Sequence, residues 1–504
     1  MATIVLEQQP KYNPLPAAQE IIFAVSEDNI VANQTRVKFI ANVYVDWNKT
    51  TLGVGTDTLV ATLKTTPNNK GVGMFDLRPI VESFVDSDNI PEHAIDTQYA
   101  IIPGWNNGQP KFKTQQYSLQ RQFPIHLIDK YSWAKHTVKW LKVKFQIEYL
   151  GADASKPNDV SIDSDFLFTP SYFIYNGYLS KQDALTGSTH SNNFGWNLEN
   201  AGFDLGGNTI SYIQNVATAR FLTDSPATLY ARKTDYGTIA TFNTLDRSFS
   251  TGMPQSNTFR FDDFKIKMYD SNNSQLGNTI VVRNRNTNGG YHNKEPYALT
   301  KYLFIGVYPA NLRGWSTDFQ AQINAMSYYT IQGFGVAQNP ITKLYRINII
   351  CENSFGYEGI RLAWLNKFGA WDYYTFNQKS VKSVATTKEQ YTQLGGTWNS
   401  EAYRPHGYKG GMKNFRVNAK ERIKINTDFL TDEESIWIES MVNSPEVYII
   451  NEYSDDDTGG IINKYVEPVI LTTSSFTRKT KANDRLVQYT FDLERNSDLR
   501  TQAV

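Results

Sequence analysis

The feature that most limits the possible folds is a pair of aromatic-rich segments in the last third of the chain. Ile360, Leu362 and Trp364 recur at every second position, which is the spacing that places side chains on one face of a β-strand. The residues Asn366–Gly369 then reverse the chain, because Gly369 accepts a positive φ that other residues avoid. The pattern predicts a β-hairpin at the centre of a sheet, with an architectural role and not a catalytic one.

The second strand of this hairpin begins at Trp371 and continues the alternation. Its aromatic side chains could form a sugar-stacking platform, as in carbohydrate-binding modules. They alternate within two adjacent strands and do not lie on a loop, so packing in a core or an interface is favoured. We expect six residues of the hairpin to be needed for the fold: Trp364, Asn366, Phe368, Gly369, Trp371 and Asp372.

The hairpin carries a recognisable pattern, Trp364-x-Asn366-x-Phe368-Gly369-x-x-Asp372-Tyr373. It resembles a signature of virion structural proteins of tailed bacteriophages that infect Bacteroidota. Three other segments resemble landmarks of the same family in the same order, namely Gly71–Arg78, Arg220–Pro226 and Ser444–Tyr448. The resemblance implies a non-enzymatic, β-rich component of the phage tail or neck.

Length and composition support a fold of several β modules. A chain of 504 residues is too long for one hydrophobic core, and about 150 residues per domain suggests about three domains. Aromatic residues make up 13% of the chain, and such side chains pack well on pleated sheets. We therefore expect a mainly β protein of antiparallel, sandwich-like modules with a few short helices. The expected domains are an N-terminal β-sandwich-like domain at 1–156, a central β domain with long Asn/Gly-rich loops at 157–338, and a C-terminal β domain at 339–504.

The first domain should contain a small helix among its strands. The helix is expected directly after Asp76, whose carboxylate can accept hydrogen bonds from backbone N–H groups, with Pro79 tolerated in its first turn. It would bury Ile80, Phe84 and Val85. The expected strands are residues 19–26, 36–47, 59–64 and 137–149, and residues 151–160 are expected to be a linker.

The C-terminal domain should contain the best helix of the chain, at about 432–443. Thr431 and Glu434 form a capping-box pattern at its start, and Pro445 ends it. Strands 447–451, 465–472 and 486–493 are expected to follow this helix. In the central domain, strands are expected at residues 264–269 and 302–307, with Asn/Gly-rich turns at 272–274 and 284–290.

Charge and cysteine content limit the kinds of binding partner and the cellular compartment that we expect for this chain. Fifty basic and fifty acidic residues cancel, which gives no support for specific nucleic-acid binding and suits a protein that assembles with its own copies. Cys351 is the one cysteine, so an intramolecular disulfide is impossible. Neither a signal peptide nor a membrane span is expected, so synthesis in the host cytoplasm is predicted.

The sequence offers no catalytic, cofactor or metal motif with specific spacing, so no catalytic residue, cofactor or metal ligand is predicted. The cluster Asp455–Asp457 fails the calcium-loop pattern, because Gly459 and Val466 stand where oxygen ligands are needed. A solvated hairpin tip is favoured over an irregular cation site. The basic run Arg478–Lys481 is similarly interpreted as a solvated strand edge, with contact to an acidic neighbouring subunit as the alternative.

These observations predict a structural subunit of a tailed-phage virion. Each copy would contact other copies and other tail or neck proteins, and an interface that closes by rotation would give a ring. Two other classes stay open. A receptor- or carbohydrate-binding module of the tail tip would bind host surface glycans, and a glycan depolymerase would place paired carboxylates in a cleft.

Overall fold

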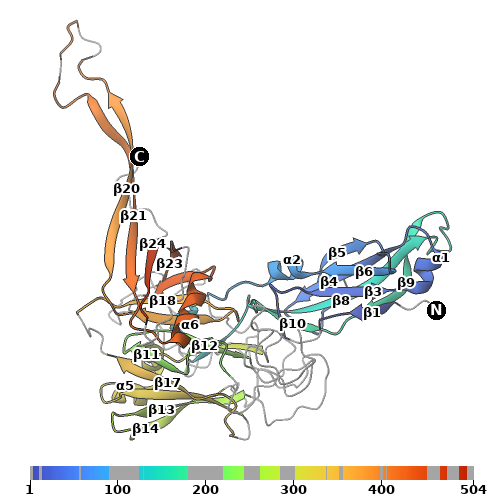
Figure 1. Ribbon diagram of the computed structural model, residues 1–504, viewed down its shortest axis with the longest axis horizontal. Helices are drawn as coiled ribbons and strands as arrows, with labels where there is room; N and C mark the ends of the chain where they lie inside the picture. Colours follow the sequence, from blue (N-terminus) through green and yellow to red (C-terminus); the bar gives the residue numbers. More distant parts are fainter. Residues whose placement is uncertain are drawn as a thin grey trace. The chain divides into compact units, whose positions relative to one another are not determined.

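The computed structural model confirms a mainly β chain with several antiparallel sheets and few short helices (Figure 1). Contacts group the chain into two compact units: Met1–Ile350 with Leu365–Asp372 and Asp457–Gly459, and Cys351–Trp364 with Tyr373–Asp456 and Gly460–Val504. The three-domain division stays a prediction. The structure describes residues 4–10, 14–55, 58–89, 124–128, 130–179, 220–242, 261–283, 301–335, 338–350, 356–397, 401–404, 406–450, 466–473 and 487–495.

Two sheets of the first unit share one hydrophobic core. Phe145 is central to it, and its ring lies 5.7 Å from Phe23 and 5.7 Å from Phe75. Gly73 leaves room for the Phe39 ring, which a Cβ at that position would strike at 2.5 Å. One sheet has the order β1 (Val5–Gln8), β3 (Ile22–Ser26), β6 (Val72–Asp76); the other has the order β2 (Leu15–Pro16), β10 (Tyr172–Tyr175), β8 (Val138–Leu150), β4 (Lys38–Asp46), β5 (Leu59–Thr65), with β9 (Val160–Phe168) also paired to β8.

The strands predicted for this region are confirmed, whereas one helix face and one linker need correction. The helix after Asp76 forms as α2 (Arg78–Val81), which continues into the 3-10 turn η1 (Glu82–Phe84), and Asp76 accepts a hydrogen bond from the Arg78 N–H. The buried face contains Val81 and Val85, while Phe84 is 38% exposed because the short 3-10 turn rotates it away from the core. The predicted linker instead connects the paired strands β8 and β9, beginning at the Leu150–Val160 pair.

Two further sheets complete the described part of the first unit. The predicted strand at 264–269 forms within β13, with Phe264, Ile266 and Met268 buried. The turn at 272–274 joins β13 to β14 as expected. The five-stranded sheet has the order β11 (Thr228–Arg232), β17 (Tyr345–Ile350), β16 (Tyr328–Gly335), β13 (Phe261–Tyr269), β14 (Gln275–Arg283), and the three-stranded sheet has the order β12 (Thr238–Phe242), β15 (Tyr302–Gly306), β7 (Tyr131–Trp133). The helices are α1 (Asp28–Asn33), η3 (Ile125–Leu127), α4 (Pro309–Trp315) and α5 (Thr317–Gln322).

A seven-stranded sheet contains most of the described second unit, and α6 (Asp432–Val442) belongs to the same unit. The predicted capping box is present, since Thr431 and Glu434 each accept a hydrogen bond from the other's backbone N–H. Trp437, Ile438 and Met441 are buried along the helix. The sheet order is β19 (Trp371–Phe376), β18 (Ile360–Leu365), β22 (Val447–Ile450), β23 (Val466–Leu471), β24 (Thr490–Arg495), β21 (Gly411–Asn426), β20 (Val381–Gln393).

The predicted hairpin forms from β18 and β19, but β18 is buried along its whole length. Arg361 is therefore only 1% exposed, although a charged side chain is rarely buried so completely. A strand covered on both faces loses the apolar and polar contrast on which the prediction rested. In the described residues, no helix is long and apolar enough to cross a membrane.

Candidate functional site

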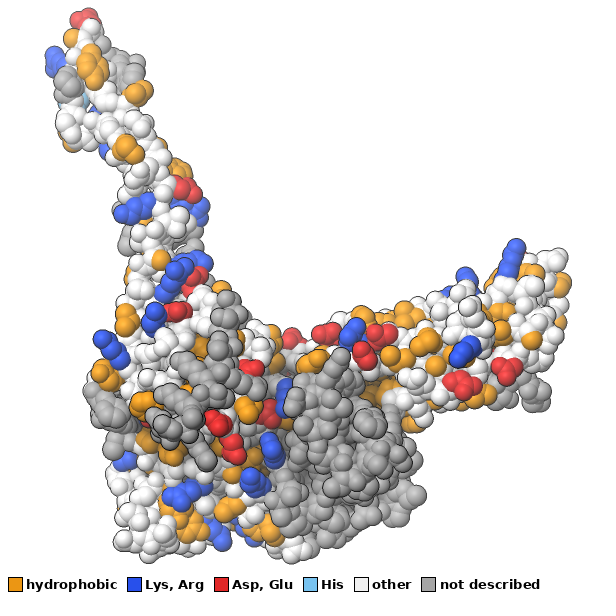
Figure 2. Space-filling model, in the orientation of Figure 1, with side chains coloured by type: hydrophobic (Ala, Val, Ile, Leu, Met, Phe, Trp, Pro, Cys, Tyr) orange, Lys and Arg blue, Asp and Glu red, His pale blue; other side chains and the backbone are white. Residues whose placement is uncertain are grey.

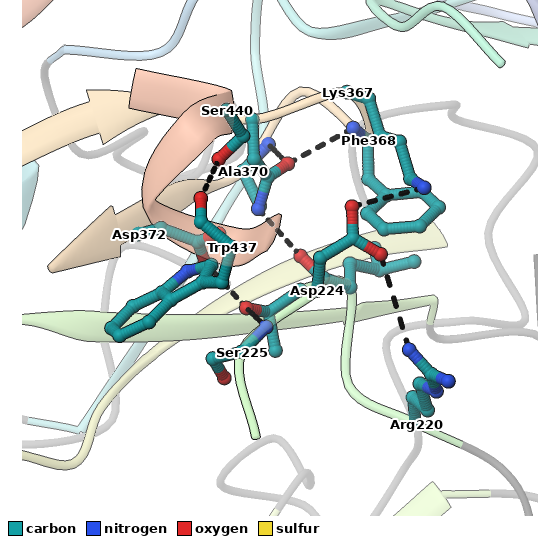
Figure 3. A network of polar contacts seen from close by, with 12 residues as sticks. Arg220, Asp224, Ser225, Lys367, Phe368, Ala370, Asp372, Trp437 and Ser440 are labelled. Carbon is teal, nitrogen blue, oxygen red and sulfur yellow. Dashed lines mark hydrogen bonds and ion pairs between the residues drawn. The ribbon is translucent and has the colours of Figure 1, made fainter. Parts of the chain in front are cut away.

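The structure joins two of the sequence motifs that lie far apart along the chain. The hydroxyl of Thr223 donates to Oδ1 of Asp372 at 2.5 Å, and Nδ2 of Asn366 donates to the Leu222 carbonyl at 2.9 Å (Figure 3). All four residues are buried or nearly so and lie in the first unit. We call the segments 220–226 and 365–372 together the motif junction.

Asn366 organises the tight turn of the junction. Its Oδ1 accepts hydrogen bonds from the N–H groups of Phe368 at 2.9 Å and Ala370 at 3.2 Å. The backbone closes the same turn, because the Asn366 N–H donates to the Ala370 carbonyl at 2.8 Å. A short amide side chain supplies both the acceptor for the turn and the donor for Leu222, which no apolar residue could do.

Gly369 is required for two separate reasons. Its φ is +75°, a conformation that L side chains avoid. A Cβ there would also lie against the carbonyl oxygen of Asn176 and 2.8 Å from Cγ2 of Thr137. The neighbouring segment approaches equally closely, since the Tyr178 N–H donates to the Lys367 carbonyl at 2.9 Å. The turn is thus held by backbone contacts that tolerate no side chain at this position.

Asp224 carries the charge at the accessible side of the junction. Its carboxylate lies 2.9 Å from Nζ of Lys367 and 3.9 Å from Nη1 of Arg220 (Figure 3). These side chains are partly exposed, and such ion pairs contribute about 0 to 1 kcal/mol each. The ion pairs therefore add little to the stability of the junction, and its geometry is set mainly by the buried hydrogen bonds.

Trp371 and Phe368 anchor the turn in apolar surroundings. Nε1 of Trp371 donates to the Asp88 carbonyl at 2.9 Å, and its ring meets the buried His126 ring edge-on at 4.9 Å. The Phe368 carbonyl accepts from the Tyr302 hydroxyl at 2.9 Å. Burial raises the pKa of Tyr302 well above its usual value, so this phenol stays a hydrogen-bond donor.

The Asp88 side chain closes a second buried network in the same unit. Its two carboxylate oxygens accept hydrogen bonds from the backbone N–H groups of Lys135, His136 and Thr137, at 2.9 to 3.0 Å. Burial raises the pKa of Asp88, and these backbone donors oppose the rise. One carboxylate thus orders the chain just before β8 begins.

Trp364 lies apart from the other five predicted residues, in the second unit. Its Nε1 donates to Oγ of Ser440 at 2.8 Å, and its ring lies 5.3 Å from Trp437 of α6. Trp364, Trp371 and Tyr373 are at most 3% exposed. These side chains are packed, as the alternation favoured, and they cannot form the alternative sugar-stacking platform, because a sugar needs an accessible aromatic face.

Three residues with important contacts were not singled out from the sequence. Thr223 lies in a segment marked by the resemblance, but nothing in that pattern indicates a hydroxyl directed at Asp372. Asp88 had no local signal at all. Nη1 of the buried Arg361 donates to Oγ1 of Thr375 at 2.8 Å, a contact across the hairpin that depends on strand pairing.

The hydrogen bonds of the junction hold distant segments of the chain together. The described residues contain no group of three His, Cys, Asp or Glu side chains that could hold a metal ion. Thr223, Asn366 and Asp372 are occupied by internal hydrogen bonds. The candidate segments Asp455–Asp457, Arg478–Lys481, 284–290 and Cys351 lie outside the described residues.

Comparisons with known proteins add no family assignment. No protein-family model matches the chain, and no curated protein matches it. A solved structure of Escherichia coli alpha-2-macroglobulin in its native conformation is similar at 8% identity and a TM-score of 0.17, and the match covers 84% of this chain but 22% of that one. The chain thus spans about a fifth of the length of that protein, and a similarity at this level carries no argument.

Proposed function

We propose that the chain is a non-enzymatic structural subunit of a tailed-phage virion, which assembles with its own copies and with other tail or neck proteins into a ring. The observation that carries the proposal is the motif junction. Two of the segments that resemble landmarks of this family, 220–226 and 365–372, bond directly to one another. The two motifs therefore serve the same structural role, which is to join two distant segments of the chain.

The chemistry of the junction supports a structural role. Its buried polar groups bond to other protein groups, and a network satisfied in this way favours a single rigid arrangement. A catalytic site would instead direct such groups toward a cavity, where a substrate would complete their hydrogen bonds. Rigidity is what a repeated subunit needs, because small errors in its geometry accumulate around a ring.

Mass photometry of the purified full-length protein across a concentration series tests the proposal, with negative-stain imaging of any large species. We expect closed rings of one defined mass to appear as concentration rises. Mass spectrometry of purified particles from a phage that encodes the chain should detect it among the virion proteins. A strict monomer that binds a host glycan, or turns it over, would contradict the proposal in favour of a receptor-binding module or a depolymerase.

A further inference from the structure

A long two-stranded ribbon in the second unit makes few contacts with the rest of its sheet. β20 and β21 pair from Val381 and Lys424 to Gln393 and Gly411. Within the described residues, β21 pairs with β24 only from Arg422 to Asn426. Beyond that point, the ten residues from Val384 to Gln393 extend for about 33 Å at the rise of a β-strand (Figure 1).

The base of the ribbon is firmly attached to the sheet. Glu494 of β24 accepts from Nζ of Lys420 at 2.6 Å and from Nε of Arg422 at 3.1 Å. Arg495 of the same strand lies 3.3 Å from Glu421. These contacts set the direction in which the ribbon leaves the sheet. They therefore also orient its outer part relative to the sheet.

The outer part of the ribbon exposes apolar side chains that a solitary hairpin would not be expected to display. Twelve of the thirteen residues of β20 are exposed, the exception being its last residue. A two-stranded ribbon alone is at best marginally stable in water, and it needs a further strand or a packed face. Figure 2 shows hydrophobic and basic side chains along it. The large exposed apolar residues are Val384, Tyr391, Leu394, Tyr403, Tyr408, Met412, Phe415 and Val417.

The ribbon has two chemically different faces. The register places Val384, Val417 and Met412 on one face, and Lys388, which pairs with Val417, lies on this face with them. Arg416 and Lys413 lie on the other face. Residues 381–421 contain seven Lys or Arg and three Asp or Glu, an excess of four positive charges. Because the whole chain has fifty of each, the remainder carries an excess of four negative charges.

The first unit offers an edge of complementary character in β9. Within the described residues, β9 pairs with β8 alone. Its exposed residues Val160, Ile162 and Phe166 alternate with Asp163 and Asp165 along the strand. Residues 151–168 contain four Asp and one Lys, so this edge is acidic. Lys144 and Lys142 of β8 lie over the Phe166 and Phe168 rings of β9, and with these two lysines included the four Asp still exceed the three Lys by one charge.

We infer that the β20–β21 ribbon of one copy docks on the β9 edge of a second copy of this chain, by addition of strands to the sheet. Strand addition provides hydrogen-bond partners for the backbone N–H and C=O groups of both edges, and the fit of the side chains determines the register. Side by side, the apolar residues of the two partners form one face, and the basic ribbon meets the acidic edge. The inference rests on the proposed function and names its subunit contact.

The first test removes the ribbon without disturbing its base. Replacing residues 386–419 by Asn-Gly joins Ala385 to Lys420, which already pair, through a two-residue hairpin turn and keeps the Lys420–Glu494 contact. We expect this variant to keep its circular dichroism spectrum and its thermal unfolding midpoint and to remain monomeric where the wild type forms rings. Rings formed by the shortened variant would overturn the inference and leave the proposed function standing. A monomeric wild type at every concentration would overturn both.

The second test asks whether the contact joins two copies at the named strands. In a Cys351→Ser background, one protein carries Lys388→Cys and a second carries Asp165→Cys. A bifunctional maleimide should cross-link only the mixture. Each protein alone has one thiol, either on the ribbon or on β9, so the predicted contact brings two thiols together only when both proteins are present. A heterodimer in the mixture supports the inference, and cross-linking no stronger than that of a mixture with Lys70→Cys replacing Lys388→Cys overturns it.

Charge reversal supplies a third readout. Lys413→Glu with Arg416→Gln, both on the basic face, should weaken assembly by about ten-fold or more, because that face loses two positive charges and gains a negative one at the acidic edge. Asp159→Lys with Asp165→Lys should do the same, and combining all four changes in one chain should restore assembly. The control Lys70→Glu with Lys343→Glu alters exposed lysines in the first unit and should have little effect. Failure of the fourfold variant to recover would overturn the charge complementarity from which the contact is inferred.

Discussion

Thr223 and Asp372 are joined by a hydrogen bond of 2.5 Å, although 149 residues separate them in the chain. The same hydroxyl oxygen accepts from the Ser225 N–H at 3.0 Å, so one side chain closes a local turn and a long-range contact together. Both residues are nearly inaccessible to solvent. Contacts of this kind are costly to break, because the group left behind is buried and without its partner.

Thr223→Val removes this hydroxyl while it keeps the shape of the side chain. We expect unfolding free energy to fall by about 1 to 3 kcal/mol, since Asp372 and the Ser225 N–H each lose a partner. Chemical denaturation measures the change. Thr66→Val, at an exposed position, is the matched control and should be nearly neutral. Equal stabilities of the two variants would show that the junction contributes little.

Gly369→Ala tests the close approach at the turn. Gly55 has a similar φ of +69°, but a Cβ there meets nothing within 4 Å. Gly55→Ala should therefore cost about 1 to 2 kcal/mol from backbone strain alone. Gly369→Ala should cost more, because the new methyl group also meets Asn176 and Thr137. Thermal unfolding of both variants gives the comparison, and equal losses would remove the steric part of the explanation.

Asp88→Asn tests the buried carboxylate network. An amide offers one acceptor oxygen in place of two, and its NH₂ group faces backbone donors, so we expect a loss of about 1 to 3 kcal/mol. Hydrogen exchange of the Lys135, His136 and Thr137 amides should accelerate in step. Asp86→Asn, an exposed residue two positions away, is the control. Unchanged protection of those amides would contradict the role assigned to Asp88.

Glu494 makes the base of the ribbon sensitive to acid. Hydrogen bonds from Lys420 and Arg422 lower the pKa of Glu494. A carboxyl group whose pKa is lower in the folded state stabilises the fold above its unfolded pKa, about 4.3, and this contribution disappears as the pH falls through the folded pKa. Denaturation curves of wild type and Glu494→Gln should therefore converge in acid.

The control for this pH series is Glu20→Gln, which changes an exposed carboxyl group in the first unit. Its stability should differ little from that of the wild type at any pH. A stability difference between wild type and Glu494→Gln that stays constant from neutral pH into acid would show that the two ion pairs are not the source of the effect.

Local patterns predicted the elements that depend on near neighbours. The capping box of α6 follows from Thr431 and Glu434, because both hydrogen bonds form within one helical turn. The strand containing Phe264, Ile266 and Met268 follows from alternation, because one face is buried as the pattern requires. Gly369 adopts the positive φ expected of the hairpin turn.

The errors arose where distant segments changed the environment of a residue. Residues 151–160 have the composition of a linker, yet they connect β8 to β9 because those strands pair. Phe84 fits an amphipathic helix but is exposed where the helix tightens into a 3-10 turn. For Arg361 no prediction was made, and its burial follows from a strand that is covered on both faces.

The order of residues along this chain was enough to predict its β character, its hairpin turn and its capped helix, because each depends on backbone preferences and on side chains a few positions apart. Only the tertiary structure shows that Thr223 contacts Asp372 and that Asp88 contacts residues 135–137. Such contacts depend on which strands pair and in what register, and that choice is made by burial of the whole core and not by any local sequence.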